Sequence, residues 1–328
     1  MNSIKILLLG TYHPTVPTLS MLIKRGYCCG LIMPPTEEVG HRNDELIKIA
    51  TDNEISFSFS IGDIDKYDPD LVIASNYPKL IPQVILDKYK CINTHWSLLP
   101  RWRGVHGTAW AILNDDEQIG YTIHSMDGEF DTGQVLLQES VANTDDLGLL
   151  ELHKDLALMQ AEGLKKIIAE YLVKGEMTGA KQNEQEATYV PKRFPEDGEI
   201  DWYWPSRRIF NLVRILPEPD YPGAFTFHNE KKIILHHTNL VACPEYWATP
   251  GQVVRVKEGI GAWVKTGDTC LEVTRVRLEG ESEYRQADQV LKRGMKLGRD
   301  LASENAVLRN RIEALEKMVS KIISNTEQ

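Results

Sequence analysis

Two apolar runs, residues 4–9 (interrupted only by Lys5) and residues 28–33, flank a segment whose apolar residues recur at helical spacing. This pattern predicts a strand, a helix and a second strand. Because apolar residues follow one another in both runs instead of alternating with polar ones, both strands are expected to be covered on both faces of a sheet. The N-terminal part is therefore predicted to be a doubly wound, Rossmann-like α/β domain.

Further apolar segments extend this domain to residue 178. They predict strands at 71–74, 91–95 and 120–126 and helices at 108–113 and 149–173. Residues 179–196 are polar, which is typical of an interdomain linker. The first domain is therefore predicted to span residues 1–178.

The chain from residue 197 to residue 298 has a different pattern. Short strand-like segments alternate there with glycine and proline turns. Closely spaced short strands of this kind are typical of a small barrel. We expect a mostly β, OB-like domain over 197–298.

Residues 299–326 show heptad spacing. The d positions hold leucine or isoleucine and the a positions hold one asparagine and two β-branched residues: Leu301, Leu308, Leu315, Ile322, then Asn305, Ile312, Val319. Opposite charges at the g and e positions, Glu304 with Arg309 and Arg311 with Glu316, suit a parallel partner. The pattern favours a coiled-coil helix that forms a homodimer, with a helix docked on its own domain as the alternative.

Composition limits the classes of partner and compartment. A formal net charge of -10 disfavours a large nucleic-acid footprint, which needs clustered Lys and Arg. Five cysteines without a C-x-x-C pair indicate neither a disulfide framework nor a zinc site, so no metal is expected. No apolar stretch is long enough to span a bilayer and the N-terminus does not resemble a signal peptide, so we expect a cytoplasmic protein without a membrane partner.

Asn93 and His95 stand two residues apart at the end of the predicted strand 91–95. Their side chains should therefore point to the same side of the sheet. In an open α/β sheet the carboxyl ends of the strands form the ligand-binding edge, which favours a functional pair. The alternative is that His95 is a core residue whose hydrogen bonds are made within the fold and that has no functional role.

The residues that follow resemble those of the 10-formyltetrahydrofolate-dependent formyltransferase family. The resemblance rests on the Asn-x-His pair, the Ser-Leu-Leu-Pro-Arg-Trp-Arg-Gly loop over 97–104 and the Asp-Thr-Gly turn over 131–133. Matches at 200–202, 211–214 and 222–225 resemble the C-terminal domain of the family. The resemblance covers residues 4–300 and leaves the heptad segment outside.

This resemblance implies a catalytic trio of Asn93, His95 and Asp131 and 10-formyltetrahydrofolate as co-substrate. It also implies that the pterin ring of the folate contacts a set of residues before and around the Asp-Thr-Gly turn. These are Leu80, Ile81, Asp127, Gly128, Glu129 and Phe130.

The chemistry of formyl transfer accounts for the three residue types. An amine that attacks a formyl carbon creates negative charge on the formyl oxygen and positive charge on nitrogen. Asn93 can donate its amide N–H to that oxygen, and His95 can move a proton near neutral pH. Asp131 can orient the imidazole and favour its charged form. The sequence leaves the order of proton transfers open.

The acceptor amine is the point at which the branches of the family diverge. The acidic segment 33–40 and the Val-His-Gly-Thr-Ala-Trp stretch after Gly104 depart from the pattern of methionyl-tRNA formyltransferases. His106 and His124 look more like the sugar N-formyltransferase branch. That branch implies a primary amine of a 4-amino-dideoxyhexose on UDP, dTDP or GDP, and a place in surface polysaccharide biosynthesis. We expect Tyr77, Lys79 and His106 to contact this acceptor.

Two other functions stay open at this point. The first is a methionyl-tRNA formyltransferase. The second is a folate-binding assembly protein without activity, although retention of three polar catalytic residues at one edge argues against it.

Overall fold

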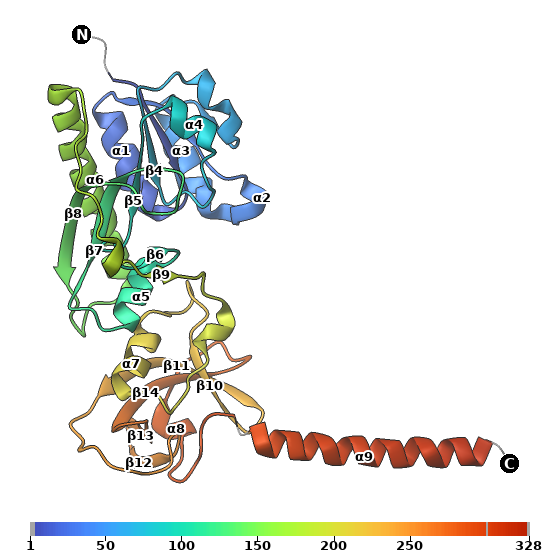
Figure 1. Cartoon of the computed structure of the whole chain (residues 1–328). Coiled ribbons are helices and arrows are strands. Elements are labelled where there is room, and N and C mark those ends of the chain that lie inside the picture. Colours follow the sequence, from blue (N-terminus) through green and yellow to red (C-terminus); the bar gives the residue numbers. More distant parts are fainter. Residues whose placement is uncertain (1–3, 300, 327–328) are drawn as a thin grey trace. The chain divides into compact units, whose positions relative to one another are not determined.

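The computed structural model describes residues 4–299 and 301–326. The chain forms two compact units, Met1–Phe194 and Pro195–Gln328, and each is described by itself (Figure 1). The boundary falls inside the range 179–196 that the sequence predicts as a linker. Within the described residues, no helix is both long and apolar enough to pass through a membrane.

The N-terminal unit is built on a seven-stranded sheet with the order β3-β2-β1-β4-β5-β7-β8. Its strands are β1 (Ile6–Gly10), β2 (Cys28–Ile32), β3 (Phe57–Ser58), β4 (Leu71–Ser75), β5 (Cys91–His95), β7 (Gln118–Ser125) and β8 (Val135–Ala142). Strands β1 to β5 are parallel, and β7 and β8 add two antiparallel strands. The domain is a Rossmann-like α/β domain, as the sequence predicts.

The N-terminal unit also contains α-helices. They are α1 (Val16–Lys24), α2 (Thr36–Val39), α3 (Asp44–Asp52), α4 (Gln83–Lys88), α5 (Gly107–Leu113) and α6 (Leu149–Lys174). Every residue of β1 and β4 is buried, because these central strands are covered on both faces. Helix α6 packs on α1 and on β7 and β8.

The carboxyl ends of β4 and β5 lie next to each other in the sheet, at Ser75 and His95. The parallel register pairs Ser75 with Thr94 and Ala74 with Asn93. Strand β7 runs antiparallel to β5, so residues 122–125 come to the same edge. This edge positions the candidate site.

The range 179–194 packs on the N-terminal unit. Ala180 forms a bridge with Val135, and the short strand β9 (Tyr189–Val190) pairs in parallel with β6 (Arg103–Gly104). The segment predicted as a linker thus contributes ordered structure next to the 97–104 loop.

The C-terminal unit holds a six-stranded sheet with the order β10-β11-β14-β13-β12, in which β15 pairs with β14. Its elements are α7 (Ser206–Arg214), β10 (Ala224–His228), β11 (Lys231–Leu240), β12 (Val253–Lys257), β13 (Gly261–Lys265), β14 (Cys270–Leu278), β15 (Arg285–Gln286) and α8 (Ala287–Val290). All neighbouring strands are antiparallel. Helix α7 packs on β11 and β14.

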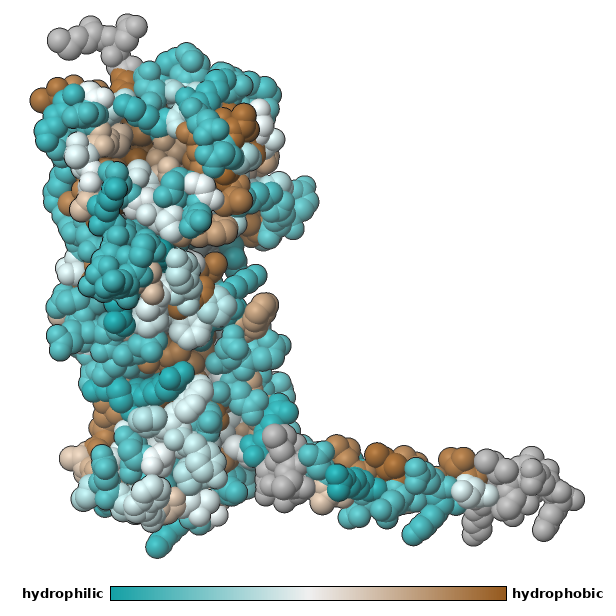
Figure 2. All heavy atoms as spheres, viewed as in Figure 1, coloured by the Kyte–Doolittle hydropathy of each residue, from teal (hydrophilic) through white to brown (hydrophobic). Residues whose placement is uncertain are grey.

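The heptad segment forms the helix α9 (Leu301–Thr326). The large apolar side chains of α9 that the structure describes are more than half exposed, and Figure 2 shows brown atoms along this helix. They are Leu308, Ile312, Leu315, Met318, Val319 and Ile322. The structure does not describe the side chains of Leu301 and Glu304, which the heptad prediction also uses.

Candidate active site

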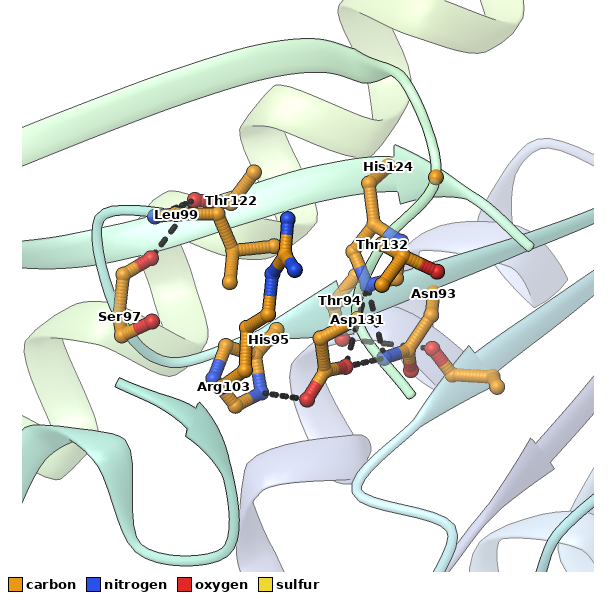
Figure 3. A network of polar contacts seen from close by, with 12 residues as sticks. Asn93, Thr94, His95, Ser97, Leu99, Arg103, Thr122, His124, Asp131 and Thr132 are labelled. Atoms are coloured by element: carbon orange, nitrogen blue, oxygen red, sulfur yellow. Dashed lines mark hydrogen bonds and ion pairs between the residues drawn. The ribbon is translucent and has the colours of Figure 1, made fainter. Parts of the chain in front are cut away.

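The three residues predicted to be catalytic lie together at the edge of the sheet (Figure 3). Asn93 and His95 project from β5, and Asp131 comes from the loop between β7 and β8. The Asn93 amide nitrogen lies 3.3 Å from Asp131 Oδ1, and His95 Nδ1 lies 3.5 Å from Asp131 Oδ2. One carboxylate therefore faces both residues of the Asn-x-His pair.

The turn that carries Asp131 depends on its glycine. Asp131 has a positive φ of 56°, and a Cβ atom at Gly133 would lie 1.7 Å from the carbonyl oxygen of Ser125. Only glycine permits that approach of the turn to the end of β7. The Asp-Thr-Gly motif therefore has a geometric reason: the glycine lets the carboxylate reach β5.

The hydrogen bonds of His95 determine its tautomer. Nε2 lies 2.9 Å from the carbonyl oxygen of Trp102, and a carbonyl can only accept, so Nε2 carries a proton. In the neutral imidazole the lone pair is then on Nδ1, the nitrogen that faces Asp131. Burial lowers the pKa of His95 below its usual 6.5, against the opposing effect of the Asp131 charge. His95 is thus a neutral base at neutral pH.

Asp131 is kept ionised although it is buried. Burial by itself raises the pKa of Asp131, but contacts with His124 and His95 and a 2.9 Å hydrogen bond from the Gly104 amide outweigh it and bring the pKa down to about 2. The carboxylate can therefore stabilise an imidazolium as it forms on His95.

His124 joins this network, although the sequence indicates it only as a residue that distinguishes branches of the family. The antiparallel register sets His124 of β7 directly opposite Asn93 of β5. Its Nδ1 donates to the Ser125 carbonyl at 2.8 Å, so Nε2 is free to accept from the Asn93 amide at 3.1 Å. Nε2 also lies 3.4 Å from Asp131 Oδ1. The sequence predicts the strand 120–126 that carries His124, but it does not show that this strand pairs with β5.

A pocket opens beside this network. Its lining includes Asn93, His124 and Asp131 together with Ala74, Tyr77, Lys79, Leu80, Ile81, Leu86, Met126, Asp127, Glu129 and Phe130. Five of the six residues predicted to contact the folate are among them, and Gly128 is in the same loop but not in the lining. His95 and His106 are not in the lining either.

Tyr77 and Lys79, predicted to contact the acceptor, line this pocket too. Lys79 Nζ forms an ion pair of 2.7 Å with Glu38 Oε1, and both side chains are partly exposed. Burial, and to a lesser degree the charge of Glu38, raises the pKa of Tyr77. The negative charge of Glu38 offsets the positive charge of Lys79 at this point.

His106 lies at the start of α5, where it adopts a left-handed conformation with φ 66°. Its pKa is lowered by burial and by the positive charges of Arg193 and Lys192. The Arg193 guanidinium also lies 6.0 Å from the ring centroid of Trp110. Three cationic or protonatable side chains thus gather beside α5.

Trp96, the residue that follows the Asn-x-His pair, packs against α6. Its indole N–H donates to Gln160 Oε1 at 2.7 Å, and its ring lies 5.0 Å from that of His153. Gln160 is buried and donates in turn to Ser75 Oγ at 2.8 Å. Trp96 therefore ties the start of the 97–104 loop to α6.

This arrangement suits acyl transfer. It provides an amide donor for a developing oxyanion, a neutral imidazole as proton acceptor and a buried carboxylate to stabilise the imidazolium. Among the described residues, no group of three or more His, Cys, Asp or Glu side chains is placed to hold a metal ion.

Comparison with known families matches well over half of the chain. Residues 34–168 match the family described as formyl transferase, and residues 193–292 match the formyl transferase C-terminal domain.

Characterised relatives include methionyl-tRNA formyltransferases. The one from Caldanaerobacter subterraneus subsp. tengcongensis is 31% identical over 294 residues, which covers 84% of this chain and 93% of the relative. The one from Fusobacterium nucleatum is 31% identical over 313 residues, which covers 90% and 99%.

Solved structures with the same fold include sugar-modifying enzymes. WlaRD, a sugar 3N-formyl transferase solved with dTDP and 5-N-formyl-THF, superposes with a TM-score of 0.62 at 18% identity and covers 86% of this chain and all of that one. HypX from Aquifex aeolicus in complex with tetrahydrofolic acid gives a TM-score of 0.56 at 20% identity over 88% of this chain and 47% of its own.

Proposed function

The chain belongs to the formyl transferase family, and from that premise we propose that it formylates the primary amine of a nucleotide-linked amino sugar, such as a 4-amino-dideoxyhexose on UDP, dTDP or GDP. It is an N-formyltransferase that takes the formyl group from 10-formyltetrahydrofolate. Membership of this family, together with an intact trio, leaves the non-catalytic alternative without support.

The charge next to the pocket is the observation that carries the choice of acceptor. A tRNA is bound largely through its phosphates, which require clustered cations. Here the segment after β2 forms α2 with Glu37 and Glu38 in its first turn, and Glu38 pairs with the pocket residue Lys79. The whole chain carries a net charge of -10. These features disfavour a polyanion at this edge.

A small anion has a better match. His106, Lys192 and Arg193 are close enough for the two cations to lower the pKa of the histidine. Helix α5 begins at Gly107, three residues after Gly104, whose backbone amide binds the Asp131 carboxylate. We propose that the side chains of His106, Lys192 and Arg193 hold the phosphates of the nucleotide, and that Tyr77 and Lys79 contact its sugar.

The pocket suits a folate. Apolar side chains (Leu80, Ile81 and Phe130) can cover the faces of a pterin ring, and the loop over 127–130 offers backbone groups for its edge. Leu80 and Phe130 are largely exposed, at 60% and 63%, and such exposed apolar groups at a pocket mouth are typical of a ligand site.

We propose the following roles for the trio. The Asn93 amide gives up its 3.3 Å contact with Asp131 Oδ1 and donates that N–H to the formyl oxygen as charge develops there. His95 takes the proton of the attacking amine at Nδ1 and returns it to the leaving nitrogen, while Asp131 stabilises the imidazolium from 3.5 Å. His124 orients Asn93 by accepting one of its N–H groups.

Formylation of methionyl-tRNA is the second candidate. It is favoured by the identity of 31% to methionyl-tRNA formyltransferases that extends over both units.

Product analysis with both acceptors tests the proposal. The protein is incubated with 10-formyltetrahydrofolate and either a panel of UDP-, dTDP- and GDP-linked amino sugars or methionyl-tRNA, and tetrahydrofolate release and product mass are followed. A formylated sugar nucleotide supports the proposal. Formyl-methionyl-tRNA alone would replace it with the second candidate, and folate turnover without a formylated product would indicate a hydrolase.

The second unit and α9 carry two structural proposals. The six-stranded antiparallel sheet supports an OB-like barrel. The exposed apolar residues at the a and d positions of α9 support a homodimer through a parallel coiled coil. Light scattering of the full chain and of a chain lacking residues 299–328 tests the dimer, because an unchanged mass would exclude this role for α9.

A further inference from the structure

The segment 180–190, which follows α6, crosses the two loops that hold the catalytic groups. One of these is the 97–104 loop, whose Trp102 carbonyl fixes His95 and whose Gly104 amide binds Asp131. The other is the turn that carries Asp131. We refer to residues 180–190 as the strap.

Gln182 of the strap binds the Asp131 turn directly. Its side-chain nitrogen donates to the carbonyl oxygens of Asp131 at 2.7 Å and Gly133 at 2.8 Å. Both N–H groups of the amide are therefore used on the turn. They hold the backbone of a non-glycine residue that has a positive φ of 56°.

Arg103 holds Gln182 in turn. Arg103 is fully buried, and it donates to Gln182 Oε1 from Nε at 3.2 Å and from Nη2 at 2.8 Å. It also reaches both carboxylate oxygens of Glu184, at 2.7 and 2.9 Å, and the Tyr189 hydroxyl at 2.7 Å. These five bonds match the five N–H donors of a guanidinium group. Such a forked cation fixes its partners in one geometry, which lysine could not do.

Backbone bonds complete the connection. The Thr188 carbonyl accepts from the Arg103 amide at 2.9 Å, and the Thr188 hydroxyl accepts from the Trp102 amide at 2.8 Å. Gly104 has a positive φ of 109°, and a Cβ there would lie 2.4 Å from the Val190 carbonyl oxygen. The strap thus lies directly on the loop that contacts His95 and Asp131. Figure 3 labels Arg103 of this loop in the same view as His95 and Asp131.

We propose that Gln182 and Arg103 are positioning residues of the formyl transfer reaction: through the strap they hold the Asp131 carboxylate against His95. Neither side chain lines the folate pocket, so their effect reaches the reaction only through the turn and the loop. The proposal depends on the formyltransferase activity and not on which amine is the acceptor.

Two substitutions separate positioning from packing. Gln182→Ala removes both donors and both acceptor contacts, whereas Gln182→Glu keeps the size and an acceptor for Arg103 but cannot donate to the two carbonyls. Gln185→Ala is the matched control, because Gln185 lies three residues further along the same strap and is exposed. Steady-state kinetics, folate-binding stoichiometry and imidazole NMR signals are measured on each full-length variant.

We expect kcat to fall by about 10- to 100-fold in both Gln182 variants, since small displacements of catalytic groups carry losses of that size. The KM for 10-formyltetrahydrofolate should stay within about threefold, because the substitutions do not change the groups that bind the ground state and the transition state equally. The His95 and His124 imidazole signals should move in both, and Gln185→Ala should match the parent chain. Unchanged kcat in Gln182→Ala, an equal loss in Gln185→Ala, or a loss matched by a lower fraction of folate-binding protein would overturn the proposal.

Discussion

Around Asp131, buried polar groups find partners from four separate segments of one chain, whereas along α9 six large apolar side chains are exposed. In a buried network, polar groups whose hydrogen bonds are all made hold one geometry, because a change of geometry would break several hydrogen bonds. Exposed apolar groups at heptad spacing gain nothing until a second surface covers them. The first region is complete within the chain, and we propose that the second is completed by another copy.

The largest effect is expected from Asp131→Asn. The amide keeps the size of the carboxylate but loses the charge that stabilises an imidazolium on His95, so kcat should fall by about 10³-fold, within the range for acid–base catalysis. Stopped-flow or steady-state tetrahydrofolate release measures it. Asp155→Asn on the exposed surface of α6 is the control, and turnover near that of the control would remove Asp131 from the mechanism.

Asn93→Ala is expected to lower kcat by about 10²-fold, which is the usual effect of losing one oxyanion donor. The substitution also leaves His124 Nε2 without its 3.1 Å donor. A larger change in KM than in kcat would mean that Asn93 binds substrate and does not stabilise the transition state.

The pH dependence should follow His95. Its pKa lies below 6.5 because of burial, and a base must be neutral, so kcat should be constant through neutral pH and fall only at more acidic pH. The Asp131 charge raises this pKa, so in Asp131→Asn the acidic limb of the residual rate should move to still lower pH. A limb that moves to higher pH would contradict the assignment of His95 as the base.

The smallest effect on turnover is expected in α9. Ile312→Lys places a charge at a central a position and should halve the mass seen in light scattering, while kcat stays within about twofold because the trio and pocket residues all belong to the other unit. Asn310→Lys adds the same charge at an outer position and should leave the dimer intact. Equal effects of the two would mean that the apolar stripe does not face a partner helix.

The sequence predicted several elements close to their observed bounds, because their apolar residues recur in the pattern of a strand or a helix. The range 91–95 coincides with β5, and the predicted helix 149–173 corresponds to α6. The edge strand β8 was not predicted, because its apolar run is short and is interrupted by Gln138, Glu139 and Ser140, while its pairing with β7 cannot be seen in the sequence. The polar strap was predicted as a linker for a similar reason, since the partners of its Gln182 side chain are 49 or more residues away in the chain.

What the sequence determined by itself is local: buried strands, the glycine of the Asp-Thr-Gly turn, the heptad of α9 and, through a resemblance, the family. What the tertiary structure decided is which distant groups meet. The register of β5 with β7 brings His124 to Asn93, the tautomer of His95 follows from the Trp102 carbonyl, and Gln182 reaches Asp131 across 51 positions. Hydrogen bonds have short range and strict geometry, so their partners appear only after the chain has folded.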